Sequence, residues 1–174
     1  MSVRLPSRPR GFTLLELILV MILIFTLAGV VMPRFSDTFP SLQLRTSADR
    51  LLSWLRKARA EAALTGVRYR LVLDTKAKKF WLAFEAQPWK DPGRFQTLEG
   101  AWTPETLPDS VTLETLEGLD QDPDQADRKV LEFRPDGTSS DATIVLGGAK
   151  GEKRTLKVVG ATSKVSIEAP PDQP

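Results

Sequence analysis

Residues 11–32 read GFTLLELILVMILIFTLAGVVM and carry the strongest structural signal in the chain. Between Phe12 and Met32 the only charged residue is Glu16. As a helix this run would be about 31 Å long, which matches the hydrocarbon core of a bilayer. A buried helix of a soluble protein rarely stays apolar on every face over such a length. The run therefore predicts a transmembrane helix over residues 12–32.

A short basic leader, MSVRLPSRPRG, precedes the apolar run. It contains Arg4, Arg8 and Arg10 and no acidic residue. Basic flanks of a membrane helix stay on the cytoplasmic side. The sequence thus predicts a single-pass membrane protein, with a cytoplasmic amino terminus and the domain after Pro33 on the opposite side of the membrane. Outside the leader the chain has 21 basic and 22 acidic side chains, a net charge of −1. This net charge gives no support to nucleic-acid binding.

The string GFTLLEL resembles the amino-terminal signature of type IV pilins and pseudopilins. In that family a prepilin peptidase cuts after the glycine, and the new terminal phenylalanine is N-methylated. The resemblance implies that residues 1–11 are a leader peptide, that cleavage separates Gly11 from Phe12, and that Phe12 is methylated. An ordinary signal anchor is the alternative.

Glu16 is a carboxylate inside the apolar run, where a charge is costly unless it has a partner or a role. The family resemblance implies that it neutralises the methylated amine of a neighbouring subunit during assembly. The alternative is a carboxylate close enough to the membrane surface to remain solvated, with no partner.

Helical periodicity continues beyond the apolar run. Pro33 and Pro40 mark positions where a helix can kink or begin. Gly66 is suited to a left-handed helix cap. We therefore expect a helix extension over residues 33–65, amphipathic from about Ser41 to Thr65. Its apolar stripe recurs at spacings of three and four residues and consists of Leu44, Ala48, Leu51, Leu55, Ala58 and Ala62.

Residues 66–169 have the pattern of a β domain. Alternation predicts a half-buried strand over residues 67–73 and a hairpin partner over 80–84. A long irregular connection follows over residues 87–110, which we expect Trp89, Phe95 and Trp102 to pin to the core. Pro135-Asp136-Gly137 has the residues of a tight turn. About seven strands are expected in all, the remaining five at residues 111–116, 130–133, 143–146, 155–159 and 164–167. Residues 170–174 are expected to be a frayed tail.

These elements predict an α+β fold: a long amino-terminal helix, transmembrane and then amphipathic, packed on an antiparallel β-sandwich-like domain. Residues 51–74, LLSWLRKARAEAALTGVRYRLVLD, and 133–148, FRPDGTSSDATIVLGG, resemble the GspH/FimT-type minor pseudopilins. The resemblance implies a structural subunit of the type II secretion pseudopilus. Its partners would be other major and minor pseudopilins, prepilin peptidase, the inner-membrane assembly platform and membrane lipid. The alternative is a FimT-like minor pilin of a type IV pilus, acting in pilus assembly or DNA uptake.

Composition argues against enzymatic activity. The chain has no cysteine and no histidine, so it lacks thiol chemistry, Cys/His zinc sites and the commonest general base. No nucleophile motif is present, and we expect no catalytic residue, no cofactor and no metal ligand set. Carboxylate or Ser/Lys catalysis remains formally open.

An acidic loop over residues 118–127 raises the question of calcium. Asp120, Asp122 and Asp124 have the one-three-five spacing of oxygen ligands. An EF-hand needs glycine at its sixth position and glutamate at its twelfth, but the chain has Gln125 and Leu131 there. The EF-hand interpretation therefore fails. A looser calcium site and a solvated acidic loop both remain open, and the second is favoured.

A cluster of basic residues near the first hairpin is the candidate for nucleic-acid binding. Trp81 lies beside it in the sequence, and basic residues with aromatics can form a groove for single strands. The alternative is the solvent face of a sheet, where lysines also protect an edge. The near-neutral charge favours that alternative, so no nucleic-acid partner is expected. The cluster consists of Arg68, Arg70, Lys76, Lys78 and Lys79.

Overall fold

The computed structural model describes residues 12–36, 38–97 and 103–168, with backbone alone for residues 28–36 and 38. It divides into an amino-terminal unit, residues 1–38, and a carboxy-terminal unit, residues 39–174. The predicted leader with Gly11, Trp102 and the predicted tail at 170–174 lie outside the described residues.

The first helix, α1 (Leu14–Ser36), contains most of the apolar run. From Phe12 to Leu27 its large apolar side chains are 41–77% exposed, so no face of this stretch is buried within the chain. Within the described residues, no helix combines the length and the apolarity needed to cross a membrane.

The second helix, α2 (Thr38–Thr65), has the predicted amphipathic stripe. Pro40 lies in its first turn, where the missing N–H costs no hydrogen bond. Gly66 has φ 71°, and its N–H donates to the Ala62 carbonyl at 3.1 Å, which caps the carboxyl end. All six stripe residues, from Leu44 to Ala62, are at most 2% exposed. The predicted amphipathic helix from about Ser41 to Thr65 and its buried face are confirmed, while residues 33–36 belong to α1.

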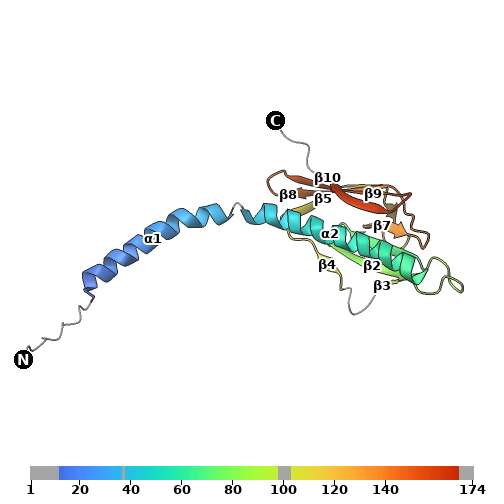
Figure 1. Ribbon diagram of the computed structural model, residues 1–174, viewed down its shortest axis with the longest axis horizontal. Coiled ribbons are helices and arrows are strands. Elements are labelled where there is room, and N and C mark those ends of the chain that lie inside the picture. The colour runs from blue at the N-terminus through green and yellow to red at the C-terminus, as the bar shows by residue number, and fades with distance from the viewer. Residues whose placement is uncertain (1–11, 37, 98–102, 169–174) are drawn as a thin grey trace, which may run out of the picture. The chain divides into compact units, whose positions relative to one another are not determined.

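In the described part of the chain, ten strands form two antiparallel sheets beside α2 (Figure 1). The first sheet has the order β3-β2-β1-β7-β6, and β4 also pairs with β2. Its strands are β1 (Tyr69–Asp74), β2 (Lys79–Glu85), β3 (Phe95–Thr97), β4 (Glu105–Thr106), β6 (Asp120–Gln121) and β7 (Arg128–Phe133).

The second sheet has the order β10-β9-β8-β5. One continuous core joins the α2 stripe to the inner faces of both sheets, with Leu71 and Phe80 from the first and Ile144 and Leu156 from the second. The predicted α+β fold, a helix packed on antiparallel sheets, is confirmed. The strands of the second sheet are β5 (Val111–Glu117), β8 (Ala142–Gly148), β9 (Lys153–Val159) and β10 (Lys164–Glu168).

The first hairpin departs from the expected half-buried pattern. Val72, Trp81, Ala83 and Val130 form a second cluster on the outer face of the first sheet, each at most 9% exposed. Phe95 packs against this cluster, as expected. The Trp54 side chain also packs against the cluster, and the Arg128 guanidinium lies 4.9 Å from the centre of the Trp81 ring.

Trp89 does not pin the long connection to the core, so this expectation is wrong. Its side chain is 95% exposed. The N–H groups of Lys90 and Asp91 donate to the Gln87 carbonyl, so Trp89 lies inside a hydrogen-bonded turn at the surface.

Candidate functional site

The amino-terminal candidate residues lie at the start of α1. Phe12 precedes the helix and is 76% exposed. The Thr13 hydroxyl accepts a hydrogen bond from the Glu16 N–H at 3.2 Å, so Thr13 caps the helix. Glu16 lies in the first turn, where the helix dipole favours a negative charge. Phe12 and Glu16 therefore both lie at the amino-terminal end of α1.

This helix start has a sequence signature that the periodicity analysis missed. Thr13-Leu14-Leu15-Glu16 follows the pattern of a capping box, threonine and then glutamate three residues on. The hydrogen bond to Thr13 uses the Glu16 backbone N–H and leaves its carboxylate available for an intersubunit role. The pattern also explains how a carboxylate is tolerated in an apolar run, because its position coincides with unpaired helix N–H groups.

The predicted basic cluster proves to be an ion-pair network on the outer face of the first sheet. Arg68 Nε donates to Glu85 Oε2 at 2.7 Å, and Arg68 NH2 pairs with Glu85 Oε1. Glu85 is 2% exposed. A hydrogen-bonded guanidinium lowers the pKa of the Glu85 carboxyl, and the same bond raises the pKa of Arg68.

The second arginine of the cluster is paired as well. Arg70 Nε donates to Glu132 Oε2 at 3.1 Å, while Arg68 NH1 reaches Glu132 Oε1 at 3.2 Å. The Arg70 guanidinium also lies 3.5 Å from the centre of the Phe95 ring. Such planar stacking orders the guanidinium against the sheet.

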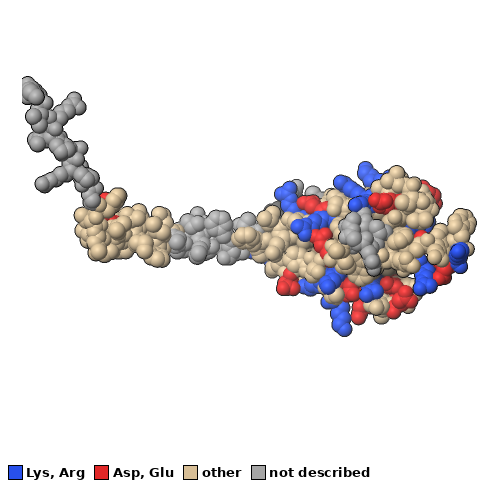
Figure 2. Space-filling model, turned by 90° about the horizontal axis from the view of Figure 1, so that it is seen from below, with Lys and Arg blue, Asp and Glu red and all other residues tan. Residues whose placement is uncertain are grey.

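The lysines of the cluster do not join this network into one basic surface. Lys78 is half-buried and its Nζ donates to the Asp109 carbonyl at 3.4 Å. Lys76 and Lys79 are exposed in and beside the hairpin turn. Figure 2 shows both charge signs interspersed over the face of the carboxy-terminal unit in view. The cluster therefore does not form a continuous groove of free cations for phosphates.

Strand pairing and a local hydrogen bond hold the acidic loop. Asp120 and Gln121 form β6, which pairs with β7, and the Asp122 carboxylate accepts the Asp124 N–H at 3.1 Å. Among the described residues, no group of three or more acidic side chains is placed to hold a metal ion.

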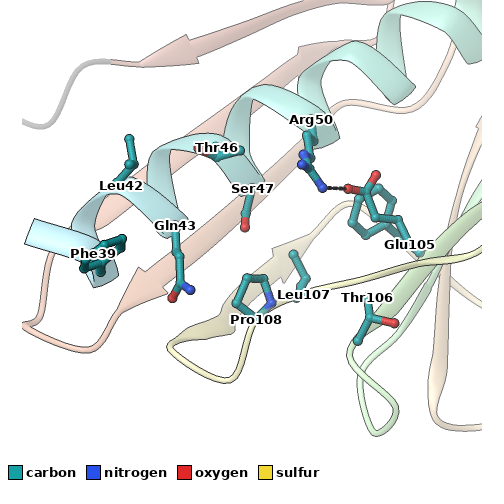
Figure 3. Close-up of a pocket in the computed structure, with 11 residues that line it drawn as sticks. Phe39, Leu42, Gln43, Thr46, Ser47, Arg50, Glu105, Thr106, Leu107 and Pro108 are labelled. Carbon is teal, nitrogen blue, oxygen red and sulfur yellow. Dashed lines mark hydrogen bonds and ion pairs between the residues drawn. The ribbon is translucent and has the colours of Figure 1, made fainter. Parts of the chain in front are cut away.

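An apolar pocket of about 230 Å³ lies between the amino-terminal half of α2 and the segment from β4 to Pro108. Gln43 and Ser47 point from the helix toward Pro108 (Figure 3). An ion pair between Arg50 and Glu105 closes one side, and Phe39 and Leu42 lie at the opposite end. The sequence analysis did not anticipate this pocket, because its walls come from segments about sixty residues apart.

Comparison with known proteins identifies two sequence families. A family model described as "Type II transport protein GspH" matches residues 47–163. A second, described as "Prokaryotic N-terminal methylation motif", matches residues 6–32. No curated protein matches the sequence.

Solved structures share the fold at low sequence identity. A structure of the minor pseudopilin EpsH from the type II secretion system of Vibrio cholerae has a TM-score of 0.57 at 15% identity, covering 73% of this chain and 97% of that one. A crystal structure of the same EpsH gives 0.55 at 15% identity, covering 76% and 97%. The type IV minor pilin FimU of Pseudomonas aeruginosa PAO1 gives 0.48 at 15% identity, covering 74% and 90%.

Proposed function

The chain belongs to the type II transport protein GspH family, and from this premise we propose that it acts as a minor pseudopilin of a type II secretion system. The observation that carries the proposal is the GspH match over residues 47–163, which includes most of α2 and all but the end of the β unit. The family role is that of a structural subunit. Its function would be to join a short pseudopilus that helps folded proteins cross the outer membrane.

The amino-terminal motif supports membrane anchoring with an exposed carboxy-terminal domain. The finer arrangement is part of the proposal: residues 12–32 anchor the chain in the inner membrane, and residues 33–65 carry the helix onward. Residues 66–169 then form the periplasmic β domain. The basic leader favours a cytoplasmic amino terminus, because lysine and arginine are retained on that side.

Processing is the first chemical event we propose for this chain. Prepilin peptidase would cleave between Gly11 and Phe12, and Phe12 would then be N-methylated. The match of the methylation motif to residues 6–32 supports this assignment. Mass spectrometry of the membrane-purified protein should find a chain that begins at methylated Phe12. A mature chain that begins at Met1 or Ser2 in cells with active peptidase would overturn it.

Glu16 is proposed to pair with the methylated amine of a neighbouring subunit. Its place in the first turn of α1, four residues after Phe12, supports this role because the carboxylate lies near the amino-terminal end of the helix, the end that carries the amine in every processed subunit. An ion pair in the membrane would relieve two isolated charges. The proposed partners are other major and minor pseudopilins and the inner-membrane assembly platform.

A secretion assay tests the functional proposal in the native host. Deletion of the gene should leave type II substrates in the periplasm, and the full chain should restore their export. The matched control is a Gly11→Leu variant, which blocks the small-residue site read by the peptidase and should fail to restore it. Normal secretion in the deletion strain, together with lost DNA uptake or pilus formation, would favour the type IV pilin alternative.

A further inference from the structure

The first turns of α2 expose two large apolar side chains beside a groove. Phe39 and Leu42 are 59% and 54% exposed, while the apolar stripe of the same helix is buried. Both line the pocket of about 230 Å³ that lies between α2 and the segment from β4 to Pro108. This volume is below the range typical of sites for small molecules, so the pocket is better suited to side chains of a protein partner.

The pocket follows one face of α2 for about three turns, and we call it the α2 groove. Gln43 and Ser47 point across it toward Pro108 (Figure 3). From Phe39 to Arg50 the groove is roughly 16 Å long at 1.5 Å per residue. This length matches a second helix that inserts apolar side chains at spacings of three and four residues. The α2 residues that line the groove are Phe39, Leu42, Gln43, Thr46, Ser47 and Arg50.

Hydrogen bonds fix the wall that faces α2. The Leu107 N–H donates to the Lys78 carbonyl at 2.8 Å, and Leu107 is 3% exposed. The Ser110 hydroxyl donates to the Gln43 side chain, which joins the end of this wall to the helix. The groove is therefore formed without a partner, and such preorganisation lowers the entropy lost on binding.

Chain connectivity keeps the α2 groove close to the proposed membrane segment at residues 12–32. Phe39 lies within about 25 Å of the end of that segment at Met32, because an extended chain spans at most ~3.6 Å per residue. Adding the length of the groove places Arg50 within about 40 Å of the same point. A partner must therefore be present at this height above the membrane. The helix of another anchored subunit, where it leaves its own membrane segment, meets this condition, whereas an exported protein is not held there.

The α2 helix of a second copy offers no further apolar side chain at this height. In the described part of α2, the large apolar side chains that are exposed are Phe39, Leu42 and Leu64. The first two already form the groove, and Leu64 lies in the last turn of the helix. A different subunit, with its own apolar side chains in this part of its helix, is therefore the better occupant.

The charges around the α2 groove do not favour a lipid occupant. The Arg50 guanidinium at one end is paired with Glu105, and the Asp109 side chain beyond Pro108 is exposed. Segments that bind an anionic membrane surface present basic residues beside their apolar face. A protein helix fits the groove better than a lipid does.

We propose that the α2 groove is the docking site for the helix of a different pseudopilin, at the part of that helix that directly follows its membrane segment. The partner helix lies along α2 and inserts apolar side chains between Phe39, Leu42 and Pro108. The exposed apolar start of α2 follows α1 directly along the chain, so the contact continues the helix packing expected inside the membrane. The assignment rests on the proposed role as a pseudopilus subunit, and it adds which surface of this subunit receives a neighbour.

Photo-cross-linking from a single cysteine tests the docking site, because the natural chain contains no cysteine. The tagged full-length chain with Thr46→Cys is labelled with benzophenone maleimide in membranes of a host that expresses the whole secretion system. Irradiation should attach it to another pseudopilin, and mass spectrometry should place the attachment in the helix that follows the partner's membrane segment. The matched control is Leu64→Cys, an exposed position on the same helix outside the groove, which should not give this product.

A second substitution tests whether the groove itself makes the contact. Leu42→Glu in the Thr46→Cys chain should lower the cross-link yield about tenfold, the effect of losing a dominant contact residue. Leu64→Glu in the same chain introduces the same charge outside the groove and should leave the yield unchanged. Both leucines are exposed, so neither change disturbs the core, and limited proteolysis of the carboxy-terminal unit verifies that both variants fold.

Four results would overturn the docking site. They are the absence of a protein product from Thr46→Cys, a product of two copies of this chain, a product with lipid alone, and equal yields with Leu42→Glu and Leu64→Glu. The secretion assay is read separately. Lost export after gene deletion without the cross-link would keep the secretion role and reject the docking site. The cross-link together with unimpaired export after gene deletion would keep the docking site and reject the secretion role.

Discussion

The guanidinium of Arg68 holds the buried carboxylate of Glu85 by two donors, and the same carboxylate accepts the Gly93 backbone N–H. Arg68 precedes β1, Glu85 ends β2, and Gly93 belongs to the loop before β3. Three successive segments of the chain therefore meet at one side chain that is 2% exposed. This arrangement links the stability of the first hairpin to the conformation of the loop that carries Trp89.

Glu85→Gln should destabilise the carboxy-terminal unit. The amide keeps the shape but leaves the Arg68 charge without its carboxylate. Breaking a buried ion pair costs about 3–5 kcal/mol, and partial exposure of Arg68 reduces the expected loss to about 2–3 kcal/mol. Pulse proteolysis of the full chain in urea would measure the loss. Lys153→Gln, which removes an exposed ion pair with Glu114, is the control and should cost less than about 1 kcal/mol. Equal losses would contradict the prediction.

Acid should weaken the same site. The pKa of Glu85 is lower in the folded state than in the unfolded state. The stability that its carboxylate contributes is therefore fully present above the unfolded pKa of about 4.3, and it is lost as pH falls through the folded pKa. Arg68 stays protonated throughout. Stability should fall below about pH 4.5, and the fall should be shallower in Glu85→Gln. Thermal melts of both proteins between pH 3 and 6 would measure this, and parallel curves would argue against the assignment.

Gly118→Ala should be among the most destabilising single changes in the β unit. Gly118 has φ 73°, and a Cβ there would lie 1.9 Å from the Asp141 carbonyl oxygen. Gly137→Ala is the control. Gly137 also has a positive φ, 82°, but a Cβ there would have no neighbouring atom within 4 Å. Its loss of stability therefore measures backbone strain alone, about 1–2 kcal/mol. The Gly118 variant should lose more than this, about 4 kcal/mol. Urea unfolding of the pair would test the difference, and similar losses would show that the turn simply shifts.

Periodicity was sufficient to predict the long elements. We predicted the apolar stripe from Leu44 to Ala62 and the seven longer strands. Each is long enough for its apolar residues to recur at a recognisable spacing. The short strands β3, β4 and β6 were not predicted, because two or three residues are too few to show an alternation of apolar and polar side chains. They pair through backbone groups, and tertiary contact alone positions them.

Side-chain pairing across the sheet was harder to infer than the strands themselves. Arg68 and Arg70 stood out as a basic cluster, but Glu85 and Glu132 are 17 and 64 residues from Arg68. Only the register that places Arg70 opposite Glu132 reveals that the charges cancel. The pocket beside Pro108 was missed for the same reason. The amino-terminal candidates were found from a local string of residues.

Glu16→Leu should separate membrane insertion from assembly. Removing a carboxylate from the apolar run lowers the cost of insertion by about 2.5–3.5 kcal/mol at the bilayer centre, and by less near its surface. Insertion should therefore be unchanged or improved, while cross-linking to other pseudopilins and secretion should fail. Thr13→Val is the control, because it removes the helix cap and keeps the charge. Normal secretion by Glu16→Leu would reject the intersubunit ion pair.

Nucleic-acid affinity should be low, because the arginines of the basic cluster are already bound to glutamates. At a physiological ionic strength of roughly 150 mM, fluorescence anisotropy with the detergent-solubilised full chain should give a dissociation constant of about 10⁻⁴ M or weaker for single-stranded DNA. Lys76→Glu removes an exposed cation of the hairpin turn without touching the ion-pair network, and it should change this value little. Tight binding that is lost in Lys76→Glu would show that the exposed lysines form a working phosphate site. That result would shift the assignment from a secretion subunit to a pilin that captures DNA.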